Sequence, residues 1–540
     1  MTTPAPENTT AIAGGKRWWA LLFLALGVAM IILDATVVNV AIPTIVKDLQ
    51  LTTTDAEWVN AIYALLFASL LLLSGRLSDI LGRRLMFVCG VGLFGVASVL
   101  VGLSGSPAEI IGARALQGVA AAMILPASLS VLNAVYRGKD RAIAFAVWGA
   151  TIGGMAALGP LVGGWLTTYA SWHWAFFINV PIAIAVVIGV MSLVPETKDA
   201  GSRGIDVSGA LLGTLGLAAL VFGLIEGQNY GWLTPKKTFS AAGFEWPLSN
   251  VSPPFVALVL AAILLVVFVL VEKKRKAAGK VVLLDLTLFS IQSFATGNAV
   301  AALVSLGEFG LLFILPLFLQ SVVGYDALQT GVILLALAAG SFVASGAGAG
   351  MAKRMGPVLV VRLGMALEVI GVLWIALALN ETVSGWALAP GLFVYGLGVG
   401  FATAQLTGVI LADVPVSESG QASAVQSTSR QVGAAIGTAL LGAVLVTGLG
   451  SIKGDLTSRG VPEPAAEQVT TVVRDSAGTA VTALPQQPGG DVLFAGAAEG
   501  FTTATKAVGF VAAALIGLGL IAAMFLPRDA ARTEAAGYAE

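Results

Sequence analysis

The sequence has little that supports chemistry on soluble substrates. Its 540 residues include one cysteine, Cys89, and one histidine, His173. A single cysteine cannot form an internal disulfide, and a single histidine cannot build a histidine-based metal cluster. There are 29 basic and 30 acidic residues, whereas an average soluble chain of this length carries roughly 135 charges. The net charge of −1 provides no basic field for nucleic acid. The sequence thus excludes a soluble multidomain enzyme and predicts neither a metal site nor a bound cofactor.

Long apolar blocks are abundant instead, because 57% of the residues are hydrophobic. About 20 apolar residues in a helix cross a bilayer core about 30 Å thick. The segment 1–17 is polar, and the block after it is too long for a signal-peptide core, so we interpret that block as a retained first helix. The sequence predicts an all-α polytopic membrane protein with fourteen spans, at 18–46, 56–74, 85–104, 107–135, 143–168, 174–194, 207–226, 255–271, 293–320, 327–350, 357–379, 385–411, 424–449 and 502–526.

The basic residues predict the orientation, because Lys and Arg resist translocation. With the amino terminus in the cytoplasm, 21 of the 29 basic residues, Arg430 among them, are assigned to the inner side and seven to the outer side, and the remaining one, Arg114, falls within the fourth block. Both termini, 1–17 and 527–540, are then cytoplasmic. Two outer connections are long: 227–254 is compatible with a small ordered hairpin, and 450–500 is interpreted as a polar, partly disordered loop.

An internal repeat indicates how the spans are grouped. GRLSDILGRR, residues 75–84, matches GAGAGMAKRMG, residues 346–356, at an offset of 271, and Asp34 has a rough partner in Glu308 at an offset of 274. Two features at nearly the same spacing superimpose six early helices on six later ones. We therefore predict an N-terminal six-helix bundle at 18–200, two inserted linker helices at 201–290 and a C-terminal six-helix bundle at 291–526.

Two charged residues lie deep in the first bundle. Asp34, in LDATVVNVAIP, is near mid-membrane, where a carboxylate costs several kcal/mol unless it is protonated, paired or facing water. It is either a proton-exchange site or a structural hydrogen-bond acceptor. Arg114, in RALQG, cannot shed its charge, and acts either in a proton relay with Asp34 or as a snorkelling interfacial cation. The amides of Asn39 and Gln117 are further candidates for substrate contact.

Glu308 in span nine is the second deep carboxylate. It binds a cationic substrate, carries a proton, or does both. Glu368 in span eleven is another substrate-binding candidate, together with Asp34. Among the tryptophans within or beside the blocks are Trp148, Trp165, Trp172, Trp174, Trp374 and Trp386, and most of these six are expected at the membrane interface. The basic run at the end of span eight is expected to contact anionic lipid headgroups, and consists of Lys273, Lys274, Arg275 and Lys276.

Two glycine-containing motifs predict contacts between helices. In GRLSDILGRR the glycines permit close backbone approach, and Asp79 can form cytoplasmic ion pairs that hold one bundle against the other. The alternative is simple positive-inside anchoring, which would explain the arginines but neither Asp79 nor the two glycines. The candidate gate residues are Gly75, Asp79, Gly82, Arg83 and Arg84. In span five, GATIGGMAALGPLVGG either seals the pore on the cytoplasmic side of a cavity or is ordinary small-residue packing with a proline kink. Its candidate residues are Gly153, Gly159, Pro160, Gly163 and Gly164.

These motifs resemble a known family. GRLSDILGRR is similar to the signature loop of the major facilitator superfamily, and LDATVVNVAIP, RALQG, GPLVGG and WHWAFFINVPI together resemble its 14-spanning drug:proton antiporters. The resemblance implies two six-helix bundles around a central cavity, with alternating access driven by inward proton flow. It assigns proton coupling to Asp34 and Arg114, the cytoplasmic latch to Asp79 with its arginines, and the antiporter signature to Gly159–Gly164. The family's acidic residue in span ten is absent, and Glu308 is the candidate replacement.

The leading hypothesis is a proton-coupled antiporter that exports amphipathic, cationic small molecules across a bacterial-type inner membrane, working as a monomer. A rival hypothesis is dedicated export of one endogenous product, such as an amino acid, peptide or self-made antibiotic. A non-transporting membrane enzyme or sensor is disfavoured, because no nucleophile/base pair, metal cluster or phosphate loop is visible and no sizeable soluble domain is attached.

Overall fold

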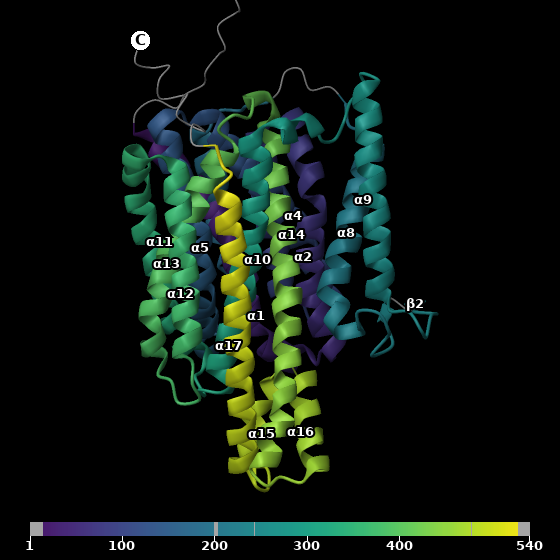
Figure 1. The fold of residues 1–540 in the computed structure, drawn as a ribbon. Helices are drawn as coiled ribbons and strands as arrows, with labels where there is room; N and C mark the ends of the chain where they lie inside the picture. The colour runs from purple at the N-terminus through teal and green to yellow at the C-terminus, as the bar shows by residue number, and fades with distance from the viewer. Residues whose placement is uncertain (1–14, 199–203, 242–243, 477, 528–540) are drawn as a thin grey trace, which may run out of the picture.

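The computed structural model describes residues 15–198, 204–241, 244–476 and 478–527. The predicted terminal segments 1–17 and 527–540 lie almost wholly outside the described residues. Long helices run side by side through most of the molecule (Figure 1). Apolar runs form helices in a bilayer because only internal hydrogen bonds can satisfy the backbone there. The long helices are α1 (Lys16–Leu49), α2 (Thr53–Leu81), α3 (Arg83–Gly102), α4 (Pro107–Val135), α5 (Gly138–Tyr169), α7 (Asn179–Leu193), α8 (Val207–Tyr230), α9 (Pro253–Ala277), α10 (Gln292–Ser321), α11 (Ala327–Met355), α12 (Pro357–Ala378), α13 (Gly385–Ile410), α14 (Ser419–Gly448) and α17 (Gly490–Ala523).

These helices correspond one to one to the fourteen predicted blocks, with the short α6 (Trp174–Phe177) preceding α7. By length and hydropathy, 12 helices of the described part of the chain can cross a membrane, or 13 when the two inclined parts of α5 count as one span. The helix α10 is not among these spans, but it has 30 residues and packs against the long helices α14 and α17. The prediction of an all-α polytopic membrane fold is confirmed.

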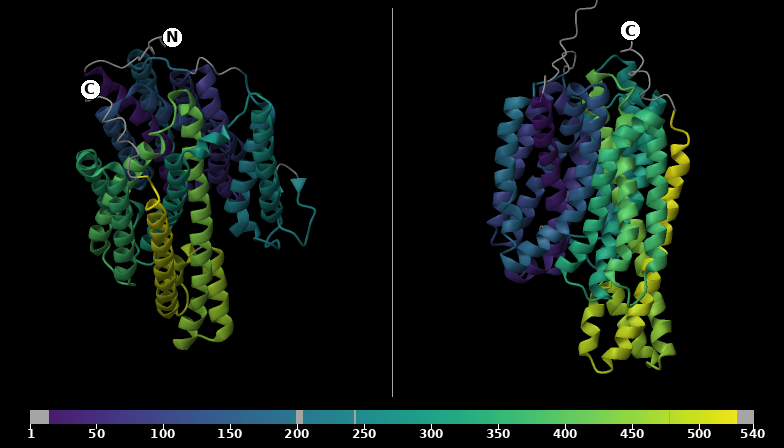
Figure 2. Two further views of the ribbon diagram at one scale, coloured as in Figure 1. Left: turned by 45° about the horizontal axis from the view of Figure 1, so that its top comes forward. Right: turned by 90° about the vertical axis from the view of Figure 1, so that its left-hand side faces the viewer.

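The helices form two groups that lie side by side. In the right-hand view of Figure 2 the purple and blue helices of the first group stand beside the green and yellow helices of the second. In the first group α1 packs on α5 and α7, while α4 packs on α2 and α3. In the second, α10 packs on α14 and α17, and α13 packs on α11 and α12. The groups meet where α5 packs on α11 and α13, and where α2 packs on α14.

The predicted linker helices are α8 and α9. They flank the bundle (Figure 1); α8 packs on α2 and α14, at the seam between the groups, and α9 packs on α8. The connection between them contains a small antiparallel hairpin formed by β1 (Ser240–Ala241) and β2 (Phe244–Glu245). The Phe239 ring beside it packs against Trp58 of α2 and Phe222 of α8. The ordered hairpin allowed by the sequence is therefore present.

The prediction that 450–500 is a polar, partly disordered loop is wrong. The segment forms η3 (Leu449–Ser451), α15 (Ile452–Ser458), α16 (Glu463–Asp475), η4 (Thr479–Gln486) and the first turns of α17. We call residues 449–489 the crown; it projects at the bottom of Figure 1, opposite the end where α17 stops, which we call the terminal end. Apolar residues at helical spacing bury a small core here, although the segment is polar on average. This core contains Ile452, Leu456, Val473, Val481 and Leu484.

Candidate functional site

Asp34 lies in a buried polar network that joins four helices. Arg114 Nη1 lies 2.5 Å from Asp34 Oδ2. The side-chain amides of Gln117 and Asn179 donate to Asp34 Oδ1 at 2.9 and 3.1 Å, and both also donate to Ser98 Oγ. The Asp34 network therefore combines α1, α3, α4 and α7, and all three donors to its carboxylate come from other helices.

The network is closed to solvent. Asp34 is 0% exposed and Arg114 is 1% exposed. The guanidinium also donates from Nη1 to Gln117 Oε1 at 2.8 Å and from Nε to the Val59 carbonyl at 3.1 Å, and it lies 4.3 Å from the centre of the Tyr63 ring. A buried charge that lacks partners is costly, so these contacts identify Arg114 as the paired cation of Asp34 and not as a snorkelling interfacial residue.

The antiporter motif contacts the helix that carries Asp34. A Cβ atom on Gly159 would overlap Thr36 Oγ1, and one on Gly163 would lie 3.2 Å from Val37. Thr36 in turn donates to the carbonyls of Ile32 and Leu33, beside Asp34. The glycines of α5 therefore hold α1 at close range within one turn of the carboxylate.

The other contacts of α5 reach the second group of helices. A Cβ on Gly153 would lie 3.1 Å from Ser341 Oγ, and Leu161 contacts Gly331; both partners are on α11. The parts Asp140–Met155 and Leu158–Thr167 are inclined by 43°. This bend lies one turn before Pro160, where the ring removes a backbone hydrogen bond. Gly164 is buried on the same helix. One bent helix thus joins the Asp34 network to the boundary between the two groups.

Asp79 joins the two groups at the terminal end, through a set of contacts that we call the latch. Its carboxylate accepts hydrogen bonds from the backbone N–H groups of Gly420 and Gln421 at 3.0 and 3.1 Å. These belong to the first turn of α14, where unpaired N–H groups and the helix dipole favour an anion. Arg83 Nη2 donates to Asp79 Oδ1 at 3.0 Å and to the Val416 carbonyl at 2.7 Å. Asp79 of α2 therefore caps a helix of the opposite group.

The other predicted gate residues divide into two sets. Gly75 belongs to the latch, because a Cβ there would overlap Ala424 and the Gly420 carbonyl. Arg84 acts within the first group instead: its backbone N–H donates to Glu196 Oε1 at 3.0 Å, and its guanidinium donates to the Val194 carbonyl. Gly82, with φ of 122°, adopts a conformation that favours glycine. Gly82 and Arg84 thus shape the loop between α2 and α3 around Glu196.

The second group contains its own buried charges. Arg430 Nη2 on α14 lies 3.4 Å from Glu308 Oε2 on α10. The assignment of Arg430 to a cytoplasmic segment is wrong, because α14 begins at Ser419 and places Arg430 eleven residues into the helix, 8% exposed. Glu368 on α12 is 0% exposed and lies near both Glu308 and Arg430. Arg430 was therefore the functional candidate that the sequence analysis missed.

A small cavity of about 30 Å³ lies between the two groups. Its walls comprise Ile32, Phe67, Leu125, Trp148 and Ile152 from the first group, and Gln426, Ser427, Arg430 and Gln431 from the second. It has room for little more than a water molecule. Trp148 therefore lines the boundary instead of the membrane interface. The candidates Asp34, Gln117, Glu308 and Glu368 are not among the residues that line this cavity, and the side chain of Asn39 is outside the described part of the structure.

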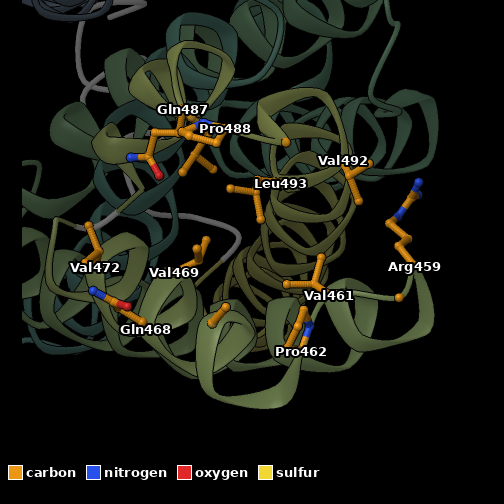
Figure 3. Close-up of a pocket in the computed structure, with 14 residues that line it drawn as sticks. Arg459, Val461, Pro462, Gln468, Val469, Val472, Gln487, Pro488, Val492 and Leu493 are labelled. Atoms are coloured by element: carbon orange, nitrogen blue, oxygen red, sulfur yellow. The ribbon is translucent and has the colours of Figure 1, made fainter.

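A larger hollow of about 550 Å³ lies in the crown (Figure 3). Apolar side chains such as Val469 and Leu493 line it, with Arg459, Gln468 and Gln487 among the polar ones. Arg459 also pairs with Glu499 of α17 at 2.7 Å. The hollow is separate from the Asp34 network and the latch, which belong to the helices beyond the crown.

Two helix groups with buried charge pairs and a latch across their boundary define a two-bundle membrane transporter. The model of the major facilitator superfamily matches residues 24–438. The chain belongs to the major facilitator superfamily, as its motifs predict. It is a multi-pass membrane protein and a transporter.

The relatives are exporters and resistance proteins. The probable actinorhodin transporter of Streptomyces coelicolor is 34% identical over 488 residues, covering 87% of this chain and 81% of that protein. The multidrug efflux pump LfrA of Mycolicibacterium smegmatis is 32% identical over 444 residues, covering 82% of each. The multidrug resistance protein Stp of Mycobacterium tuberculosis is 31% identical over 459 residues, covering 85% of this chain and 81% of that protein.

A solved structure shows the same fold. The human organic anion transporter MFSD10 (TETRAN) superimposes with a TM-score of 0.52 at 15% identity, and the match covers 93% of this chain and 100% of that one. At such low identity the likeness bears on the fold alone.

Proposed function

We propose that the protein is a proton-coupled antiporter that exports amphipathic small molecules by alternating access. The observation that carries the proposal is the position of Asp34, a fully buried carboxylate whose paired cation, Arg114, lies on another helix. A proton on Asp34 would remove the charge that Arg114 balances. Because a buried guanidinium left without its partner is costly, protonation would drive the contact between α1 and α4 to rearrange.

The packing of α5 offers a path from this event to the boundary between the two groups. A shift of α1 displaces Thr36 and Val37, which contact Gly159 and Gly163, and the same helix contacts α11 through Gly153. The latch at Asp79 closes the terminal end in this conformation. Export then requires the latch to open so that cargo enters at the terminal end, which we propose is cytoplasmic in a bacterial-type inner membrane.

Proton flow is an adequate energy source. One elementary charge that moves through 100 mV supplies about 2.3 kcal/mol, which corresponds to a gradient of tens-fold. We propose cationic cargo as the first class to test, because a buried carboxylate such as Glu308 can bind a cation. Exchange of one proton for one monovalent cation moves no net charge and uses only the pH gradient, so the membrane potential contributes only when more than one proton is exchanged. Arg430 lines the cavity and Glu308 lies directly behind it, so such a cation would meet Glu308 only after Arg430 moves.

The second candidate function is dedicated export of one endogenous product. It is favoured by the relatives named as an actinorhodin transporter and as a tetracenomycin C resistance and export protein. Growth of an efflux-deficient host across a panel of toxicants distinguishes the two: broad protection supports multidrug export, and protection against one chemical class supports dedicated export.

We also propose that anionic lipid contacts the basic end of α9. Arg275 pairs with Asp206 at 2.7 Å, and Lys276 pairs with Asp285. Partial burial raises the pKa of the Asp285 carboxyl, but hydrogen bonds from Lys276 and Thr287 outweigh it and hold the pKa below its ordinary value. Lys273 and Lys274 are exposed, and they are the pair that we expect at lipid headgroups.

The test uses proteoliposomes with an imposed proton gradient and a fluorescent lipophilic cation as cargo. We expect Asp34→Asn to lower gradient-driven uptake at least tenfold. Asp48→Asn is the matched control: Asp48 lies on the same helix but is exposed and accepts from Trp172 Nε1. Transport by Asp34→Asn at the wild-type rate and against the same gradient contradicts the proposal.

A further inference from the structure

The two helix groups differ in how their buried charges balance. In the first, one carboxylate, Asp34, faces one guanidinium and accepts three hydrogen bonds. In the second, the single guanidinium of Arg430 contacts Glu308, and a second buried carboxyl group, Glu368, lies near this pair without such a contact. The first site is neutral with Asp34 ionised. The second has one acid more than it has cations.

Burial makes this excess acid costly if it is ionised. Glu368 is 0% exposed and Glu308 is 3% exposed. Within the described part of the chain, neither Glu368 Oε1 nor Oε2 has a hydrogen-bond partner, and Glu308 Oε1 has none either. An ionised carboxylate that has neither hydrogen-bond donors nor a countercharge of its own is too costly to bury in an apolar interior, whereas a neutral carboxylic acid can be buried there.

The geometry decides which of the two acids is neutral. Glu308 Oε2 lies 3.4 Å from Arg430 Nη2, and a permanent cation at that distance favours the ionised form. No comparable contact to Glu368 is found among the described residues. Its stem packs over Gly398 of α13, where a Cβ would lie 2.6 Å from Glu368 Cγ. The nearby phenol of Tyr395, also on α13, is buried, and its hydroxyl has no hydrogen-bond partner among the described residues. The charged or titratable groups of the cluster are thus Glu308, Glu368, Tyr395 and Arg430.

We infer that Glu368 is a second proton-binding site of this protein, occupied while Arg430 pairs with Glu308. The number of bound protons depends on Arg430. While its guanidinium stays at Glu308, the cluster holds one proton, on Glu368. If Arg430 turns from Glu308 toward the cavity that it lines, Glu308 loses its countercharge and takes up a second proton from water. A role of this site in transport rests on the proposed antiport, whereas the bound proton itself does not.

Infrared spectroscopy of the purified protein tests the inference without any gradient or cargo. A protonated carboxylic acid has a C=O stretch distinct from that of a carboxylate. We expect the wild type to show this band at neutral pH, Glu368→Gln to lose one acid's share of it, and Glu308→Gln and Asp34→Asn to retain it. Arg430→Gln should gain a second acid's share, because Glu308 then lacks its cation.

Retention of the full band in Glu368→Gln overturns the inference, as does its loss in Glu308→Gln, which would place the proton on the other acid. The Arg430→Gln arm keeps the test decisive if Glu368→Gln does not fold, because an unchanged band there also overturns the inference. Tyr395→Phe should retain the band. Failure of the proposed antiport is read separately: Asp34→Asn would then transport normally while the infrared result at Glu368 stands.

Discussion

The carboxylate of Asp79 on α2 accepts a hydrogen bond from the backbone N–H of Gly420, 3.0 Å away across the boundary between the two helix groups. Glycine at position 420 is required by this contact, because a Cβ there would overlap the Asp79 carboxylate. The bond and its neighbour from Gln421 join the end of α2 to the start of α14. An acid of the first helix group therefore caps a helix of the second group at the terminal end.

Loss of the Asp79 carboxylate should open this end. Hydrogen bonds to a charged group contribute about 1.5–3 kcal/mol each, so removal of two of them shifts the closed-to-open equilibrium about a hundredfold or more. We expect Asp79→Ala to accelerate labelling of Ser130→Cys, in a background with Cys89→Ser, by a membrane-impermeant thiol reagent. Ser130 is 0% exposed and donates to the Ser419 carbonyl across the boundary.

Glu196→Gln is the control for this experiment. Glu196 is also an acid near the terminal end, but it accepts from Arg84 and Leu85 within the first half. Its substitution should leave the labelling rate unchanged. Equal labelling in Asp79→Ala and in the parent protein would contradict the assignment of Asp79 as the latch.

A methyl group at Gly159 should stop transport by separating α1 from α5. The Cβ of Gly159→Ala would overlap Thr36 Oγ1, and overpacking of this kind costs about 1–3 kcal/mol and displaces the backbone. We expect at least a tenfold lower transport rate at normal membrane expression. Gly92→Ala is the matched control, because no atom lies within 4 Å of a Cβ at that position.

The second change Thr36→Gly tests whether the clash is the cause. It removes the atoms that the new Cβ would meet, at the cost of about 1 kcal/mol for a glycine inside a helix. Partial recovery of transport in the double variant is the expected result. If the double variant transports no better than Gly159→Ala, contact between Gly159 and Thr36 is not what links α5 to the Asp34 network.

Sequence analysis predicted the helices well because span length is set by bilayer thickness, and apolar blocks of that length are visible without any knowledge of packing. It also named Asp34 as a partner for Arg114, beside the alternative of a snorkelling cation, since a buried acid and a buried base have few other ways to be satisfied. It could not identify the partner of Asp79, because backbone N–H groups of Gly420 and Gln421 carry no side-chain signal.

Arg430 was misplaced for a related reason. The apolar block seen in the sequence starts at 424, so a basic residue shortly after its start resembles an anchor at the membrane edge. The helix in fact starts at Ser419, which places Arg430 about 16 Å along it. A polar stretch that is buried between two halves cannot be distinguished from a loop by hydropathy alone. The crown was missed in the same way, since its short helices bury only one face.

The pair formed by Glu308 and Arg430 should show energetic coupling. Arg430→Met leaves Glu308 without a cation, and uptake of a proton by Glu308 limits the loss of stability to about 1–3 kcal/mol. Glu308→Gln in the Arg430→Met background should restore much of that loss. Thermal unfolding of the four proteins in detergent gives the cycle, and additive effects of the two changes would rule out a direct interaction.

The crown predicts a contrast between two neighbouring valines of α16. Val473 is 0% exposed in the crown core, whereas Val472 is 51% exposed. An aspartate at Val473 places an unpaired charge in an apolar core and should unfold the crown, while Val472→Asp faces solvent and should be tolerated. Trypsin digestion of the purified protein measures the difference at Lys453, Arg459 and Arg474. We expect rapid cleavage at these sites in Val473→Asp and resistance in both the wild type and Val472→Asp; equal cleavage in all three proteins would show that the crown is not a folded unit in solution.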